Sequence, residues 1–454
     1  MIQSEIEGQT SSIPADLLSD FTHRDLLEEE FWRSIPCYAE LDSKEFNDHR
    51  FQSRNCVTSV DKLRQVLGDL VDDGFYTDVE AGISRSPMSI RISPYLLSLI
   101  NWENPHSDPL RIQFLPLAST AKKDHPNLHL DALNEIEDSP VSGLTHRYSD
   151  RALFLALDKC PVYCRFCTRS YAIGLDTEDV EKIHFGAQRE RWEDVFLYVE
   201  EHKEIEDIVV SGGDVANLRA DSISYIGQRL IDIPHIQRMR FATKAPAVMP
   251  QKLLMDHDWR NSLIDLAVQG RKQGKEIALH THFNHPNEIT AITKSGLEPF
   301  IHEGMVVRNQ TVLQRNVNDN FDTMQLLVRR LGWIGVKPYY VFLHDMVRGV
   351  EDLRTTLQTA LDLEKKVRGV TAGYNTPNFV LDTMGGGGKR NVHSYEYYDP
   401  DTGVAVFTSP SVRPGNHFYY FDPIDTLASE YQQLWSEEKT RNSMIREVLE
   451  KARI

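Results

Sequence analysis

From about residue 150 onward, the chain alternates between short apolar runs and longer stretches in which apolar residues recur every three or four positions. The short runs predict buried β-strands, and the longer stretches predict amphipathic helices. We predict strands at residues 152–157, 205–210, 238–242, 277–282, 305–309 and 338–343, and helices between them at 222–233, 260–273, 322–331 and 350–367. Six successive strand and helix units indicate an α/β protein with a parallel barrel or partial barrel, whose chemistry lies at the carboxyl ends of the strands.

The segments on either side differ from this pattern. Residues 1–140 predict a mainly helical region, with helices at 25–33, from Ser59 onward and at 93–100, and a polar, irregular stretch at 117–143 that wraps over the rest of the protein. Residues 391–454 predict a hairpin around 399–403 and a final helix. That helix has one apolar face, formed by Ile424, Leu427, Tyr431, Leu434 and Trp435. We therefore divide the chain into 1–140, 141–390 and 391–454, and expect the last helix to dock on the body of the protein or on another subunit.

Composition narrows the class of protein. The 454 residues are 41% hydrophobic and carry a formal net charge of -17, which argues against a nucleic-acid groove because phosphate binding needs clustered Lys and Arg. The first residues lack the basic start and apolar core of a signal peptide, and no apolar run reaches membrane-spanning length. With few cysteines, three of them close together, we expect a cytoplasmic protein without disulfides.

Three cysteines, Cys160, Cys164 and Cys167, fall within eight positions directly after the first predicted barrel strand. Thiolates are soft ligands for zinc or for an iron-sulfur cluster. Structural zinc usually takes four protein ligands in two pairs, and no second pair is present. Three thiolates on a [4Fe-4S] cluster would leave one iron open to a small molecule, which indicates catalysis. A zinc site completed by a distant histidine, or cysteines that only pack, are the alternatives.

Two other motifs end predicted strands. The second strand runs into residues 211–214, where glycines let the backbone approach a ligand and a carboxylate can accept a bond from an ammonium group, although an ordinary turn explains the motif equally well. His280 and His282 end the fourth strand and point to the same face. A His-ligated, metal-dependent hydrolase is therefore the alternative from a different class. Histidines that line a pocket through hydrogen bonds fit the same pattern.

Four consecutive glycines precede Lys389. The motif fails as a phosphate-binding loop, because Thr383 stands at the required first glycine and Arg390 follows the lysine. A flexible glycine run that presents one lysine can instead form a Schiff base with a carbonyl cofactor such as pyridoxal phosphate. An exposed loop lysine is the alternative.

Taken in order, these motifs resemble the lysine 2,3-aminomutase family, whose members are radical S-adenosylmethionine enzymes that also use pyridoxal phosphate. The resemblance covers about residues 32–401 and includes residues 143–151, the cysteine loop up to Arg169, and residues 211–214, 282–286, 309–313, 337–340 and 381–389. It implies a partial (β/α)6, TIM-like radical S-adenosylmethionine barrel with a helical N-terminal region and a short C-terminal extension.

The resemblance also implies roles for individual residues. The cluster ligands are Cys160, Cys164 and Cys167, and the residues near the cofactors are Ser211, Gly212, Gly213, Asp214, Gln310, Arg147, Arg151 and Lys389. Of these, Lys389 forms the imine with pyridoxal phosphate, and Arg147 and Arg151 lie near its phosphate. The substrate ligands are Arg169 for the α-carboxylate, and Asp345 and Asp382 for the distal ammonium of lysine. Paired carboxylates select a cationic side chain.

The implied activity is an isomerase reaction that moves the α-amino group of a free amino acid to its β-carbon, with L-lysine as the first candidate. An external electron donor would reduce the cluster. Arginine, ornithine, another amino acid or a lysine on a protein are the alternative substrates, and a homo-oligomer is left open. Three departures from the family concern the substrate and the assembly. No cysteine follows Cys167, so the zinc segment of the clostridial-type members is not expected; Asn316 replaces a glycine; and His344 and Arg348 flank Asp345.

Overall fold

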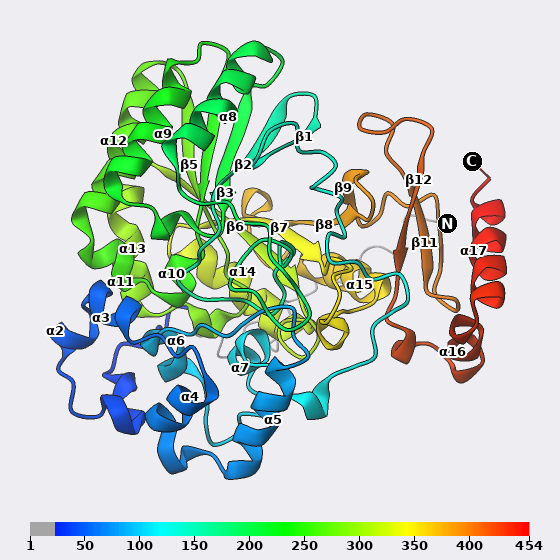
Figure 1. Cartoon of the computed structure of the whole chain (residues 1–454), viewed down its shortest axis with the longest axis horizontal. Helices are drawn as coiled ribbons and strands as arrows, with labels where there is room; N and C mark the ends of the chain where they lie inside the picture. The colour runs from blue at the N-terminus through cyan, green and yellow to red at the C-terminus, as the bar shows by residue number, and fades with distance from the viewer. Residues whose placement is uncertain (1–22, 454) are drawn as a thin grey trace, which may run out of the picture.

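The computed structural model describes residues 23–453, and its centre is a barrel-like sheet of nine strands in the order β1 to β9 (Figure 1). Strands β2 to β8 pair in parallel, whereas β1 and β9 are antiparallel to their neighbours at the two edges. The strands are β1 Leu144–Tyr148, β2 Arg151–Leu157, β3 Asp207–Gly212, β4 Arg238–Ala242, β5 Glu276–Thr281, β6 Val306–Leu313, β7 Lys337–Leu343, β8 Asn378–Thr383 and β9 Gly388–Asn391. This architecture confirms the predicted α/β barrel.

Helices cover the outside of the sheet (Figure 1). They are α8 Arg189–Glu201, α9 Ala220–Asp232, α10 Ala245–Val248, α11 Gln251–Met255, α12 His257–Lys272, α13 Ala291–His302, α14 Phe321–Trp333 and α15 Leu357–Val367. In α9 the buried positions include Ile223, Ile226 and Leu230, three and four residues apart, so that one face packs inward. The spacing of apolar residues in the sequence of α9 therefore agrees with the side chains that are buried in the structure.

The six predicted strands are all present with small shifts at their ends, but the sheet has a seventh parallel strand, β8, which the sequence analysis missed. Its last residues are polar and lead into the glycine run, so they do not form a clear apolar run. The predicted helix at 350–367 is too long. The helix α15 begins only at Leu357, after Arg354 in extended conformation, and the Thr356 side chain caps it.

The N-terminal region is helical, with α2 Ser43–Phe46, α3 His49–Arg54, α4 Val60–Leu67, α5 Asp73–Ile83, α6 Pro94–Leu99 and α7 Pro109–Phe114. As predicted, the Ser59 side chain caps α4 by accepting a bond from the Lys62 amide. The helix predicted at 25–33 is wrong, because only a 3₁₀ turn, Phe31–Ser34, forms there. Leu27 instead pairs with Thr290 in a β-bridge, a tertiary contact that overrides local helical spacing.

Beyond the barrel, β10 Tyr397–Asp399, β11 Val404–Thr408 and β12 His417–Phe421 form a separate antiparallel sheet, and its first hairpin confirms the predicted turn. The helices α16 Ser429–Ser436 and α17 Glu438–Ala452 follow, and α17 runs along this sheet at one side of the molecule (Figure 1). The predicted apolar face is only partly correct. Trp435 is buried and donates to the Thr402 carbonyl, but Leu434 is 38% exposed.

One continuous apolar core joins the N-terminal helices, the barrel and the C-terminal sheet. It includes Trp32 and Tyr95 from the first region, Phe154 and Phe241 from the barrel, and Phe407 from the last sheet. Within residues 23–453, we find no helix that is both long and apolar enough to cross a bilayer.

Candidate functional site

The three clustered cysteines lie in the loop that follows β2. Cys160, Cys164 and Cys167 all line a cavity of about 210 Å³ at the carboxyl ends of the strands, and all three are free and partly buried. Burial raises the pKa of each thiol, that of Cys164 to about 12, so thiolates at these positions need a cation to balance them. Within residues 23–453, no three or more His, Cys, Asp or Glu side chains are already arranged to hold a metal ion. The donor chemistry and the shared cavity fit a thiolate-bound metal group.

Because the cysteine loop has no regular secondary structure, the N-terminal region supplies partners for its backbone. Arg91 donates from Nε to the Pro161 carbonyl at 3.0 Å, and its own carbonyl accepts a bond from the Tyr163 amide at 2.9 Å. Arg165 donates to both carboxylate oxygens of Asp352 at 2.9 Å, and its amide donates to the Gln113 carbonyl. The helical region therefore fixes the loop that carries the cysteines.

The glycines at the end of β3 make room for the backbone that leads into this loop. A Cβ on Gly212 would lie 2.2 Å from the Leu157 carbonyl oxygen, and one on Gly213 would lie 2.3 Å from that of Lys159. Asp214 is buried, and its carboxylate accepts bonds from the amides of Ala216 and Lys244. The backbone that approaches these glycines closely is thus that of residues 157–159 of the protein itself. Gly212 and Gly213 also line the cysteine cavity.

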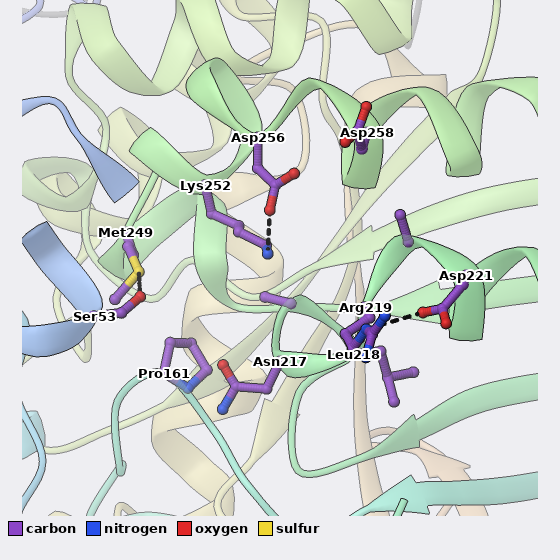
Figure 2. A pocket seen from close by; sticks show the side chains of 12 residues that line it. Ser53, Pro161, Asn217, Leu218, Arg219, Asp221, Met249, Lys252, Asp256 and Asp258 are labelled. Atoms are coloured by element: carbon purple, nitrogen blue, oxygen red, sulfur yellow. Dashed lines mark hydrogen bonds and ion pairs between the residues drawn. The ribbon is translucent and has the colours of Figure 1, made fainter. Parts of the chain in front are cut away.

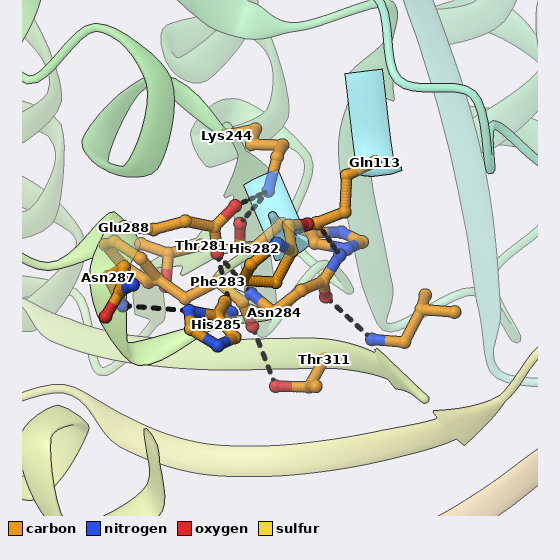
Figure 3. Close-up of polar contacts among 12 residues, drawn as sticks. Gln113, Lys244, Thr281, His282, Phe283, Asn284, His285, Asn287, Glu288 and Thr311 are labelled. Carbon is orange, nitrogen blue, oxygen red and sulfur yellow. Dashed lines mark hydrogen bonds and ion pairs between the residues drawn. The ribbon is translucent and has the colours of Figure 1, made fainter. Parts of the chain in front are cut away.

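His280 and His282 line the same cavity, as their spacing predicts, and each has a buried Nε2 atom without a hydrogen-bond partner within residues 23–453. His282 is also part of a polar network that includes Lys244, Asn284 and Glu288 (Figure 3). In it, the Lys244 ammonium donates to the His282 carbonyl and pairs with Glu288 at 2.9 Å. Burial lowers the pKa of His280 to about 3, so this imidazole is neutral at physiological pH. Among the described residues, no group of three or more His, Cys, Asp or Glu side chains that could hold a metal ion includes this pair.

A second cavity, of about 330 Å³, adjoins the first. Its wall carries four predicted site residues that are absent from the first cavity, namely Arg147, Arg151, Asp382 and Lys389. The residues common to both cavities are Arg169, Ser211, Ala242, His280 and Gln310. Apart from Asp345, every predicted site residue lines one of the two cavities.

Lys389 reaches this cavity because the glycine run is a tight hairpin turn between β8 and β9. Three of the four glycines have positive φ, between 79° and 90°, and a Cβ on Gly387 would lie 2.3 Å from the Thr383 hydroxyl. The turn places Lys389 directly opposite Asp382, with Nζ 3.0 Å from Oδ2. The Lys389 amide also donates to the Tyr148 hydroxyl at 2.8 Å, which links β9 to β1 across the gap between the sheet edges.

Several arginines also line the second cavity. Arg147 pairs with Asp138 at 2.6 Å, and Arg151 lies 3.8 Å from the centre of the Tyr148 ring. The sequence analysis missed Arg240, which pairs with Asp207 at 2.6 Å and lines the same cavity. The sequence pattern that could have identified Arg240 is the alternation of side chains along β4. Met239 and Phe241 are buried on one face of the strand, so Arg240 between them points to the other face, toward the barrel interior.

Asp345 lies beside the second cavity but does not line it. Its Oδ2 accepts a bond from the Thr168 hydroxyl at 2.6 Å, and its Oδ1 is buried with no hydrogen-bond partner in the part of the chain that the structure describes. Burial, together with the neighbouring charge of Asp382, raises the pKa of Asp345 to about 7. Of the flanking residues that depart from the family, His344 is buried and bonds the Asp345 carbonyl, whereas Arg348 is exposed.

A larger cavity of about 510 Å³ touches the cysteine loop at Pro161 (Figure 2). Pro161 borders both this cavity and the cysteine cavity. Four of the five charged side chains among its described lining residues form two ion pairs, Lys252 with Asp256 and Arg219 with Asp221. No predicted site residue lines it, and the chemistry therefore belongs to the two inner cavities.

Curated proteins of known activity resemble the chain over most of its length. It is 35% identical to an L-lysine 2,3-aminomutase of Acetoanaerobium sticklandii over 357 residues, which cover 78% of this chain and 80% of that protein. It is 34% identical to the L-lysine 2,3-aminomutase of Clostridium subterminale over 79% of this chain and 81% of that protein. It is 30% identical to the glutamate 2,3-aminomutase of Clostridioides difficile over 76% of each. No protein-family model matches the chain. The chain is thus an isomerase of the amino acid 2,3-aminomutase type and belongs to the lysine 2,3-aminomutase family.

Proposed function

We propose that this protein is a radical aminomutase that converts a free amino acid with a cationic side chain, L-lysine in the first place, into its β-isomer. One observation carries the proposal. The cysteine cavity and the Lys389 cavity meet at Arg169, His280 and Gln310, so that groups held in the two cavities would face each other. Two adjoining compartments suit a reaction in which a reactive group and a substrate must be aligned while water is excluded.

The first compartment suits a [4Fe-4S] cluster and S-adenosylmethionine, and the second suits pyridoxal phosphate. Cys160, Cys164 and Cys167 would ligate the cluster, and residues 211–214 would border the S-adenosylmethionine. The cluster, reduced by an external electron donor, and S-adenosylmethionine together would supply a carbon radical, while pyridoxal phosphate would supply the carbonyl that carries the migrating amino group. Positioning of these groups is the task of the protein.

The second compartment has the charges that an anionic cofactor needs. Arg147, Arg151 and Arg240 would hold the phosphate, since guanidinium groups bind phosphate oxygens in pairs. Lys389 is the one lysine among the described residues on this wall, and the hairpin delivers its amine to the interior. Tyr339 and Tyr340, whose ring centres lie 3.9 Å apart, add an aromatic surface for a planar ring.

For the substrate, Arg169 would bind the α-carboxylate, and Asp382 with Asp345 would bind the distal ammonium. Asp382 already pairs with an alkylammonium group, that of Lys389, which stands in for the end of a lysine substrate. A second carboxylate beside Asp382 would repel an acidic side chain, so a glutamate-like substrate is disfavoured.

Product analysis tests this proposal. Anaerobically reconstituted enzyme, with S-adenosylmethionine, pyridoxal phosphate and a reductant, would be offered lysine, arginine, ornithine, glutamate and alanine separately. We expect β-lysine as the main product. A different β-amino acid would overturn the assignment of the ammonium site, and no β-amino acid from any of them would overturn the free amino acid as substrate. Iron content provides a matched control, because Cys164→Ala should lose the cluster whereas Cys37→Ala should keep it.

A further inference from the structure

Glu135 is a buried carboxylate in the irregular segment that covers the barrel, and sequence analysis gave no reason to single it out. Its position is fixed locally. Both oxygens of Asp131 accept backbone amides, those of Glu135 at 3.0 Å and Ile136 at 2.9 Å, and Asn134 adopts a left-handed φ of 60°. This turn points the Glu135 side chain at the wall of the Lys389 cavity.

The two oxygens of Glu135 have different partners. Oε1 accepts a bond from Nη2 of Arg169 at 2.7 Å, and Oε2 accepts one from the Tyr171 hydroxyl at 3.0 Å. The Glu135 side chain is 5% exposed and that of Arg169 is 24% exposed. Arg147 also contributes positive charge near Glu135, but it is bonded to Asp138. Arg169 is therefore the partner that balances the buried carboxylate.

Arg169 keeps donors for a second anion. It lines both cavities, and its Nε atom is buried without a partner among the described residues. Since a guanidinium has five N–H groups, the bond to Glu135 leaves others free to bind a ligand carboxylate. The same arginine thus has a resident carboxylate on one side and an accessible cavity on the other.

We propose that Glu135 is the resident counter-charge of Arg169 and limits how tightly this arginine binds the α-carboxylate of an amino acid. The proposal rests on the role of Arg169 in the proposed function. With Glu135 present, the arginine is neutralised in the empty site, and an arriving carboxylate adds an excess negative charge. Without that charge, the ligand carboxylate would become the sole anion that balances the guanidinium, and its binding would strengthen.

The test is the variant Glu135→Gln, because the glutamine oxygen can still accept a bond from Arg169 and its amide nitrogen can donate to the Tyr171 hydroxyl, while the negative charge is lost. Enzyme loaded with pyridoxal phosphate would be titrated with L-lysine and with 1,5-diaminopentane, the same chain without the carboxylate, through the visible absorption of the cofactor. Neither S-adenosylmethionine nor reductant is needed. We expect lysine to bind about fivefold more tightly than to the wild type, the upper range for a partly exposed charge pair, and the diamine to bind unchanged.

Glu135→Asp is the matched control, since it keeps the charge on a shorter side chain, and its ratio of lysine to diamine affinity should stay within about twofold of the wild type. Equal changes for both ligands in Glu135→Gln, or weaker binding of lysine alone, would overturn the proposal. If Glu135→Asp changed the ratio of lysine to diamine affinity as much as Glu135→Gln does, the proposal would also be overturned. Wild-type enzyme that responds to no amino acid would instead overturn the proposed function, and this inference with it.

Discussion

Lys389 and Asp382 are cross-strand neighbours in the β8 and β9 hairpin, and their side chains form an ion pair with Nζ 3.0 Å from Oδ2. The charge of Asp382 raises the pKa of Lys389 well above its usual range, so the lysine is an ammonium ion in the empty site. A lysine substrate carries the same group at its distal end. The distal ammonium of a lysine substrate would therefore replace the Lys389 ammonium at Asp382. This exchange would free Lys389 to bind the cofactor.

Replacement of Lys389 tests its proposed role directly. Lys389→Ala should abolish the visible absorption of protein-bound pyridoxal phosphate and reduce product formation below detection, because within residues 23–453 this is the one lysine on the cavity wall. Lys203→Ala, at an exposed position, is the matched control and should keep both signals. Retained absorption in the Lys389 variant would remove this residue from its assigned role.

Removal of the charge on Asp382 should separate substrates by their side chains. In Asp382→Asn we expect kcat/KM for lysine to fall at least about thirtyfold, since truncation of one partner of a buried charge pair costs roughly 2 kcal/mol or more. The same substitution removes the group that holds Lys389 protonated, so the pKa of Lys389 should fall. The rate of pyridoxal phosphate uptake would then rise at neutral pH relative to the wild type. Kinetics with lysine, and stopped-flow mixing with the cofactor, measure the two effects, and an unchanged kcat/KM would contradict the first.

Asp345 should make the stability of the protein depend on pH. Burial and the charge of Asp382 raise its pKa to about 7, above its unfolded value near 3.9. Between these values the folded protein holds a proton that the unfolded chain has released, so stability should fall as pH rises from about 4 to 7. In the wild type, loss of the Asp345 proton should lower Tm by about 2 °C between pH 5 and pH 8. Asp345→Asn should remove this part of the pH dependence. Thermal unfolding at both pH values measures it, with the exposed Asp194→Asn as control; identical slopes in wild type and Asp345→Asn would contradict the assignment.

The parts of this molecule that were predictable from sequence are those in which local pattern and chemistry coincide. The cysteine loop follows a strand whose apolar run is unambiguous, and three of the four glycines before Lys389 have φ values that only glycine readily adopts. Residues whose role depends on a distant partner were not predictable. The role of Glu135 depends on its bond to Arg169, and Leu27 is not helical because it forms a β-bridge with Thr290. Spacing along the chain contains no information on such pairs.

The N-terminal region, whose sequence indicates no activity, should control how well the cysteine loop is held. Arg91→Ala removes the side-chain bonds to the carbonyls of Pro161 and Ser53. We expect Cys160 in metal-free protein to react with iodoacetamide about tenfold faster, because loss of a charge-assisted bond makes local opening easier by roughly 1.5 kcal/mol. Peptide mass spectrometry gives the rate at each cysteine, with the exposed Cys37 as internal reference and Arg85→Ala, at an exposed position, as control. Should all cysteines react at the wild-type rate, the Arg91 side chain would not contribute to holding the loop.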